Sequence, residues 1–215
     1  MYFSYGEMEL DHLKKADEKL GRAIDHIGMV YRPVMDDLFA CLVQKILGQQ
    51  VSSAAQMTVW NRMLHRLGQV SPEGILSLSR NELQQLGMTY RKADHIRSLS
   101  QKVFDGTLVL DRLYGCSDSE VIRQLSSLDG IGPWTAEMVL AFCMQRPDVF
   151  SFGDLGIHKG LRMLHGLPKI DRVQFEELRR RYSPCGTTAS LYLWEIAKGA
   201  LPGLSDPGQK KEERK

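Results

Sequence analysis

Three observations predict an all-α fold for this sequence of 215 residues. Apolar residues recur three and four positions apart along most of the chain, which is the period of an amphipathic helix. Most of these runs begin at Ser or Asp, whose side chains cap helix N-termini, and several stop at glycine. No segment alternates apolar and polar residues consistently enough to predict a sheet.

The predicted helices each combine a capping residue with a stripe of apolar side chains. Residues 1–30 are expected to pack on the helical core that these helices form. Thr107–Leu110 is the one segment that indicates a short extended piece. In chain order, the first predicted helices run from Asp36 or Asp37 through Gln49, from Ser52 or Ser53 to Gly68, and over a short stretch that begins at Ser71. A long helix is predicted after Leu83–Met88, through Phe104 to Gly106, and another begins at Ser117. The last four are predicted over 133–144, 154–165, 171–182 and 187–198.

Composition limits the classes of protein to which the chain can belong. With 43% apolar residues it can bury a core as one compact domain or as two closely packed lobes. Its formal net charge of +2 is too small for a uniformly basic surface, so affinity for nucleic acid must come from local patches. Arg179–Arg181 and Arg91–Lys92 are candidate phosphate contacts, although such runs more often form a solvated helix face.

The cysteines indicate neither a zinc site nor a disulfide framework, because they are far apart and form no Cys-x-x-Cys pair. No membrane span or signal peptide is predicted, since Asp11, Lys14 and Lys15 interrupt the start of the chain. We therefore expect a cytoplasmic protein. The four cysteines are Cys41, Cys116, Cys143 and Cys185.

The segment Leu128–Ala136 reads Leu-Asp-Gly-Ile-Gly-Pro-Trp-Thr-Ala and is the most informative motif in the chain. Its two glycines flank one apolar residue, so the backbone can turn tightly with its amides exposed. Pro133 suits the first position of a following helix, whose exposed N–H groups would bind a phosphate. Further along, Asp154 is expected at another helix N-terminus, where its negative charge is stabilised.

The hairpin, Trp134 and the segment Asp154-Leu155-Gly156-Ile157 resemble the helix-hairpin-helix DNA glycosylase superfamily. Within it they are most similar to the 3-methyladenine DNA glycosylase II branch. The resemblance covers Asp36 to Trp194 and includes Ile46–Ser52. It implies a two-lobed helical helix-hairpin-helix glycosylase fold with the active site in the cleft between the lobes.

The same resemblance predicts the domain organisation. One glycosylase domain is expected over residues 1–200, with the hairpin at about 125–137, and a flexible C-terminal tail over 201–215. The bacterial relative carries an additional N-terminal α+β domain, for which this chain is too short.

The activity that the resemblance implies is a monofunctional DNA glycosylase of base excision repair. Such an enzyme flips a damaged base out of the duplex and hydrolyses its N-glycosidic bond, which leaves an abasic site. The implied substrates are alkylated purines, 3-methyladenine and 7-methylguanine. The implied partner is double-stranded DNA containing damaged bases, and no binding to a membrane is expected. The protein is expected to act as a monomer, and to associate with the nucleoid if it is bacterial.

The resemblance also assigns roles to individual residues. Asp154 is the predicted catalytic residue, because a carboxylate would stabilise the positive charge that develops on the deoxyribose. Gln50 is the predicted plug that fills the gap left by the flipped base. Trp60 matches no functional position and is assigned to the core. The predicted substrate pocket consists of Trp134, Met138 and Trp194, and the predicted DNA contacts are Gln49, Gln50, Gly130, Ile131, Gly132 and Thr135.

One family residue is missing from the hairpin. Relatives that also cut the DNA strand carry a lysine nucleophile two residues beyond the second glycine, where this chain has Trp134. No lyase activity is therefore expected. No cofactor is expected for the chemistry, and no iron-sulfur cluster, because closely spaced C-terminal cysteines are missing. A Na⁺ or K⁺ ion could bind the hairpin through the main-chain carbonyls of Ser126, Leu128 and Ile131.

Three other functions remain open at this stage. The same machinery could act on hypoxanthine or mismatched bases, because sequence does not define the pocket geometry. A non-catalytic helix-hairpin-helix protein could bind DNA damage, although binding gains nothing from a carboxylate near phosphates. A metal-dependent nuclease is disfavoured, because no acidic cluster accompanies Asp154.

The remaining residues near these motifs have expected roles of their own. The small pair Cys185-Gly186 predicts a more open rim before the last helix. Asp148 is expected to be structural, and His158 and His165 are expected to be packing or surface residues.

Overall fold

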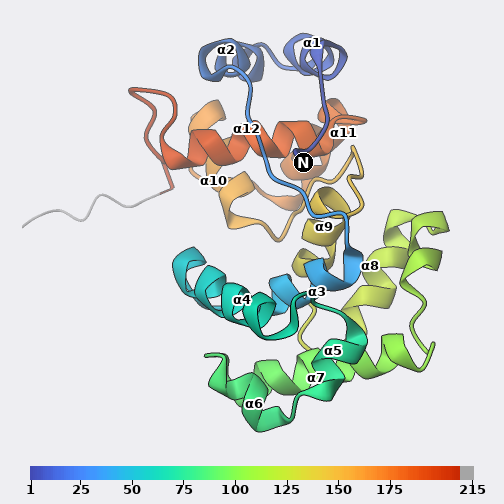
Figure 1. The fold of residues 1–215 in the computed structure, drawn as a ribbon. Coiled ribbons are helices and arrows are strands. Elements are labelled where there is room, and N and C mark those ends of the chain that lie inside the picture. Colours follow the sequence, from blue (N-terminus) through green and yellow to red (C-terminus); the bar gives the residue numbers. More distant parts are fainter. Residues whose placement is uncertain (209–215) are drawn as a thin grey trace, which may run out of the picture. The chain divides into compact units, whose positions relative to one another are not determined.

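The computed structural model describes residues 1–208, which fold as helices joined by short loops (Figure 1). Within that range the backbone forms one isolated antiparallel bridge, between Tyr2 and Pro33, and no strand. The predicted all-α fold is confirmed. The chain divides into two compact units: one contains Met1–Val34 and the chain from Gln145 onward, and the other contains Met35–Met144.

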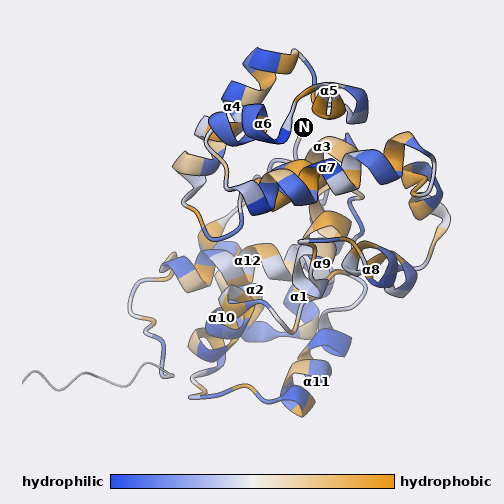
Figure 2. Ribbon diagram, turned by 90° about the horizontal axis from the view of Figure 1, so that it is seen from below, coloured by the Kyte–Doolittle hydropathy of each residue, from blue (hydrophilic) through white to orange (hydrophobic). Residues whose placement is uncertain are grey.

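The unit Met35–Met144 is organised around α3. This helix is mostly in the hydrophobic colour where its ribbon is visible (Figure 2), and eight of its ten residues are buried. It contacts α4, α7 and α9. Trp60 of α4 is 7% exposed, which confirms its assignment to the core. The helices of this unit are α3 (Leu38–Leu47), α4 (Ser53–Leu67), α5 (Pro72–Ser77), α6 (Arg80–Gln85), α7 (Tyr90–Phe104), the 3₁₀ helix η1 (Leu110–Gly115), α8 (Asp118–Ser126) and α9 (Pro133–Phe142).

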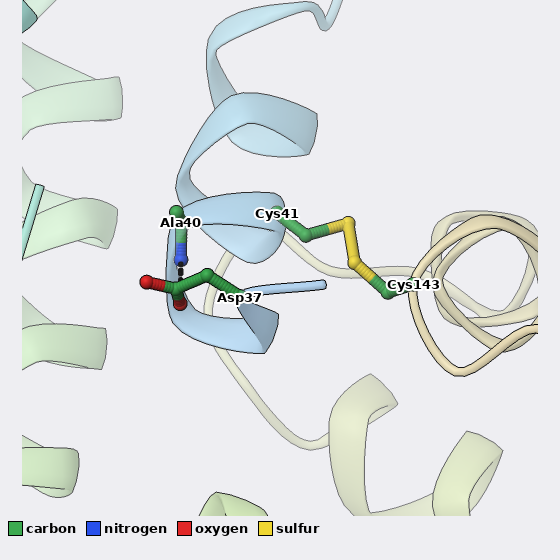
Figure 3. The surroundings of a disulfide bond; sticks show 4 residues. All are labelled: Asp37, Ala40, Cys41 and Cys143. Atoms are coloured by element: carbon green, nitrogen blue, oxygen red, sulfur yellow. Dashed lines mark hydrogen bonds between the residues drawn. A yellow bond between two sulfur atoms is a disulfide. The ribbon is translucent and has the colours of Figure 1, made fainter. Parts of the chain in front are cut away.

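Most helix starts in this unit lie at the predicted caps. The Asp37 carboxylate accepts the Ala40 N–H at 2.9 Å (Figure 3), and Ser52, Ser71 and Ser117 cap α4, α5 and α8 in the same way. These side chains accept N–H groups that would otherwise lack a partner.

The long helix predicted after Leu83–Met88 is α7, which Thr89 caps and which ends at Phe104. One prediction about this part of the chain was wrong. Thr107–Leu110 forms no strand; it turns out of α7 and leads into η1. A local turn there replaces the extended segment that the apolar pattern predicts.

A disulfide joins Cys41 on α3 to Cys143 at the end of α9 (Figure 3). The sequence predicted no disulfide, and this prediction was wrong. The two cysteines are separated by 102 residues, so no local spacing could pair them. They meet because α3 and α9 pack against each other.

The other unit consists of α1 (Glu7–Ala16), α2 (Glu18–Ile27), α10 (Leu155–His165), α11 (Arg172–Tyr182) and α12 (Gly186–Lys198). Helices α10 and α12 lie side by side, and α1 and α2 contact both α12 and its neighbours. Leu13, Leu20 and Ile24 are buried in one cluster with Phe175 and Tyr192. The predicted packing of residues 1–30 on the helical core is confirmed.

The segment after α12 is tied to the same unit. Arg162 binds Asp206 through two hydrogen bonds, of 2.8 and 2.6 Å, and the Asp206 side chain is 3% exposed. Leu201 packs against the core of the unit. The sequence predicted a flexible tail over residues 201–215, whereas these contacts reach residue 206; residues 209–215 of that prediction lie outside the described residues. None of the helices in residues 1–208 has the length and apolar character needed to cross a membrane.

Candidate functional site

The predicted hairpin forms between α8 and α9. Gly130 has a φ of 79°, a conformation that L side chains rarely adopt, and the Ile131 N–H closes the turn on the Leu128 carbonyl at 3.1 Å. A Cβ on Gly130 would also overlap the imidazole of His95. Gly132 and Pro133 then start α9, as predicted. Within the described part of the chain no side chain caps this helix.

The predicted DNA contacts of the hairpin are main-chain groups. The side chains of Ile131 and Thr135 are buried, at 4% and 7% exposure, while Gly132 is exposed. Of the predicted hairpin contacts, only main-chain atoms could therefore reach a phosphate. Such contacts position a duplex without reading its sequence.

The loop after α3 (residues 48–52, the Gln50 loop) is bonded to the hairpin. The Gln49 amide donates to the Gly130 carbonyl, and the Lys92 ammonium donates to the carbonyls of Leu47 and Gln49 at 2.7 and 2.8 Å. Burial lowers the pKa of Lys92. Both side chains are half-buried and bonded to main-chain carbonyls, while the contacts of Gln49 with DNA and of Lys92 with a phosphate stay predictions from the sequence.

Like Val51 after it, Gln50 is exposed in this loop. Its φ of 55° lies in the left-handed region, which is uncommon for a residue with a side chain. Backbone strain of this kind persists only where neighbouring contacts enforce it, and it is concentrated at functional sites. The bonds of Gln49 with Gly130 and with Lys92 hold the chain directly before Gln50.

A cavity of about 540 Å³ lies beside the loop and the start of α9. Arg91 is exposed at its wall and Trp134 is 48% exposed. An aromatic ring next to cationic side chains is suited to stacking a base and binding a phosphate. The residues that line the cavity are Gly48, Gln49, Gln50, Val51, Thr89, Arg91, Lys92, His95, Trp134 and Thr135. Met138, one turn beyond Trp134, is 6% exposed and does not line it.

Asp154 caps α10, as the sequence predicts. Its Oδ1 accepts the Ile157 N–H at 2.9 Å, and the side chain is 6% exposed. The same Oδ1 accepts the indole N–H of Trp194 at 2.9 Å. A buried carboxylate at a helix N-terminus is stabilised by the helix dipole and by donors of this kind.

The two histidines of α10 have structural roles. The His158 Nε2 lies 2.8 Å from the Phe152 carbonyl oxygen and its ring stacks on Phe175. The imidazole of His165 lies 3.4 Å from the Tyr182 hydroxyl, and burial lowers its pKa. Both histidines are packing residues, as predicted.

Asp148 holds the start of α12. Its two carboxylate oxygens accept the Gly186 N–H at 3.0 Å and the Ser183 hydroxyl at 2.6 Å, which confirms the structural assignment. Cys185 and Gly186 are both buried, and a Cβ on Gly186 would lie 2.8 Å from Asp148 Oδ1. The prediction of an open rim at this pair was wrong, because the glycine makes room for the carboxylate.

The basic run on α11 is a solvated face. Arg179 pairs with Glu176 at 2.7 Å, and Arg181 lies 3.5 Å from Glu177. These acids are on the same helix, so the run does not require an anionic partner. Among residues 1–208, no group of three His, Cys, Asp or Glu side chains could hold a metal ion.

A protein-family model covers most of the chain. It matches residues 43–185 and is described as "HhH-GPD superfamily base excision DNA repair protein". The chain belongs to the HhH-GPD superfamily. The matched range includes the loop at Gln50, the hairpin and Asp154.

Individual HhH-GPD relatives are similar over nearly the whole chain. DNA-3-methyladenine glycosylase 1 of Schizosaccharomyces pombe is 31% identical over 196 residues, which are 87% of this chain and 86% of that protein. The crystal structure of a DNA-3-methyladenine glycosidase from Bacillus halodurans is 33% identical, with a TM-score of 0.81 over 93% of each chain. The S. pombe enzyme Mag1 in complex with abasic DNA is 30% identical, with a TM-score of 0.78 over 91% of this chain and 99% of that one.

Sequence reasoning missed two contacts around the HhH-GPD motifs. Lys92 is 45 residues from Leu47, and Trp194 is 40 residues from Asp154, and both pairs meet only in the folded chain. The spacing of Asp154, Gly156 and Ile157 carried a partial signal for the second contact, because a glycine two residues after a cap leaves space for a large neighbour.

Proposed function

We propose that this chain is a DNA glycosylase that removes alkylated purines, such as 3-methyladenine and 7-methylguanine, from duplex DNA. The observation that carries the proposal is the buried Asp154 carboxylate, held at the N-terminus of α10 in a member of a base excision repair superfamily. The names of the relatives in S. pombe and B. halodurans support the choice of alkylated purines. DNA as the partner is supported by the abasic-DNA complex of Mag1.

Binding and flipping are assigned to the hairpin and the Gln50 loop. In this proposal the N–H groups at the start of α9 contact a DNA phosphate, and Gln50 enters the gap left by the flipped base. Trp134 offers an aromatic face to the extruded purine. A methylated purine is cationic, so stacking on indole gains about 0.5–2 kcal/mol from the cation–π attraction. Met138 remains a prediction from the sequence for the pocket.

The proposed chemistry is hydrolysis at C1′ of the deoxyribose. The bond between C1′ and the purine nitrogen breaks, its electron pair leaves with the purine, and the purine becomes neutral. A water oxygen forms the new bond to C1′ and releases its proton. The Asp154 carboxylate stabilises the positive charge that develops on the sugar between these events.

We also propose that the enzyme has no lyase activity. Strand cutting requires an amine nucleophile that forms a Schiff base with C1′. The hairpin position that carries lysine in strand-cutting relatives is Trp134 here, and an indole cannot form that bond. The product is expected to be an intact strand with an abasic site.

The proposed function is tested by incubating purified protein with methylated duplex DNA. Free 3-methyladenine or 7-methylguanine is expected in the supernatant, and the strand is expected to stay uncut until alkali is added. If neither base is released, the alkylated-purine assignment fails. Release from hypoxanthine or mismatch duplexes in the same assay would then identify the neutral-base alternative, and tight binding without release of any base would identify a damage-binding protein.

Replacing Lys92 by methionine is expected to lower the rate of base release by roughly tenfold, because the loop that presents Gln50 loses both charge-assisted bonds. The measurement is the single-turnover rate on methylated duplex. Lys102→Met, on the same helix α7, is the control and should leave the rate unchanged. An equal rate for Lys92→Met would remove the loop from the flipping step.

A monovalent cation at the hairpin is a further part of the proposal. The main-chain carbonyls of Ser126, Leu128 and Ile131 would hold it, and it would contribute a positive charge toward a DNA phosphate. The turn is compatible with this role, because the Leu128 carbonyl accepts one N–H, from Ile131, and a carbonyl oxygen has two lone pairs. The expected result is weaker DNA binding when Na⁺ and K⁺ are replaced by a bulky organic cation at equal ionic strength.

A further inference from the structure

Trp194 makes a specific polar contact in addition to any stacking. Its Nε1–H donates to Asp154 Oδ1 at 2.9 Å, and Oδ1 also accepts the Ile157 N–H at 2.9 Å. The two donors come from different helices, α12 and α10. Hydrogen bonds to a carboxylate are about twice as strong as those between neutral groups. One oxygen of Asp154 is therefore held from two directions.

The chain leaves space for this contact at Gly156. A Cβ at that position would lie 2.7 Å from Trp194 Cδ1 and 3.1 Å from Asp154 Oδ1. The φ of Gly156 lies outside the left-handed region, so its backbone conformation does not require glycine. The requirement is for space, and the space is occupied by the indole and the carboxylate together.

The position of Trp194 along α12 is set by its neighbour Leu193. A Cβ on Gly160 of α10 would lie 2.9 Å from the Leu193 carbonyl carbon and closer still to its oxygen. The backbones of α10 and α12 thus approach each other directly at the residue before Trp194. This close approach determines where the indole N–H meets Asp154.

One face of the Trp194 ring is already opposite a cation. The Arg32 guanidinium carbon lies 5.9 Å from the ring centroid. A second cation on that face would be repelled by the first, so a methylated purine gains little by stacking there. That face of the ring is therefore poorly suited to stack a cationic base.

We propose that Trp194 is a positioning residue for Asp154, which it orients for catalysis through its indole N–H. This inference rests on the proposed function, because it assigns a role in the reaction that Asp154 is proposed to catalyse. Trp194 touches the carboxylate, and Asp154 is the residue that acts on the sugar. The role depends on the N–H group and does not depend on the aromatic surface.

Two substitutions separate the N–H group from the aromatic surface. Trp194→Phe keeps a six-membered ring and removes the donor. Trp194→His lacks the benzene ring but can place its Nε2–H close to the position of the indole Nε1–H. We expect Trp194→Phe to lower the single-turnover rate of base release about 10- to 100-fold, with little change in affinity for abasic duplex. Trp194→His should recover a large part of that loss.

The opposite order of rates would overturn the inference. If Trp194→Phe keeps the wild-type rate and Trp194→His loses it, the ring acts as a pocket wall. Gly156→Ala is a third variant, and it should slow the reaction with Trp194 intact, because the added methyl displaces the indole. Asp154→Asn in the same assay isolates the proposed function: full activity in that variant removes the chemical role of Asp154, whereas an inactive Asp154→Asn beside a fully active Trp194→Phe contradicts only the positioning role.

A measurement without activity tests the hydrogen bond itself. The chain has three tryptophans and hence three indole N–H signals in a ¹⁵N NMR spectrum. The signal that disappears in Trp194→Phe should exchange slowly with solvent in the wild-type protein and faster in Asp154→Ala. Unchanged exchange in Asp154→Ala would show that the bond is not present in solution.

Discussion

Asp154→Asn is expected to lower the single-turnover rate of methylated-base release by about 10² to 10³, the usual cost of removing one preorganised charge from an active site. The side chain keeps its shape, and asparagine caps helices as well as aspartate does. The Ile157 N–H can therefore still be accepted, and the fold should be retained. The loss would reflect the negative charge alone. The measurement is base release from methylated duplex with enzyme in excess.

Asp171→Asn is the matched control for this prediction. Asp171 caps α11 in the same unit and accepts the Gln174 N–H at 2.9 Å, the same bond that Asp154 makes on α10. A general weakening of helix caps would slow both variants. A loss confined to Asp154→Asn would identify chemistry, and equal rates for both variants and the wild type would leave Asp154 with a capping role only.

Gly160→Ala is expected to destabilise the fold by about 3 kcal/mol, although alanine is the better helix former by about 1 kcal/mol. The added Cβ would overlap the Leu193 carbonyl, and a backbone atom cannot rotate away as a side chain can. Helices α10 and α12 would have to separate. For a chain of this size the melting temperature should fall by about 6–12 °C.

Gly115→Ala tests whether the effect of Gly160→Ala is one of space. A Cβ on Gly115 would meet no described atom within 4 Å, and its φ is outside the left-handed region. The melting temperature of the Gly115→Ala variant should differ from that of the wild type by no more than about 2 °C. A Gly160→Ala variant as stable as the wild type would mean that α10 and α12 do not approach as closely in solution.

Local signals predicted most of the secondary structure. Ser117 begins α8 with a capping box to Glu120, and Asp154 and Asp171 begin α10 and α11. Each of these contacts joins residues three positions apart, so their pattern is visible in the sequence. The hairpin was equally predictable, because glycine adopts a positive φ readily and Gly130 has such a φ.

Predictions failed where a contact depends on the packing of whole helices. The disulfide of Cys41 with Cys143 requires α3 to lie against α9. The burial of Gly186 against Asp148 requires the start of α12 to return to the loop before α10. The apolar periodicity of these segments does not predict either of these two long-range contacts.

The all-α class, the helix starts, the hairpin and the position of Asp154 at a cap could be predicted from the sequence, because they depend on backbone conformation and on hydrogen bonds between near neighbours. The folded chain was needed to show that Lys92 holds the Gln50 loop and that the Trp194 indole N–H donates to Asp154. Those bonds form between residues 40 or more positions apart, and their geometry is set by how closely helices approach, as at Gly160 and Leu193.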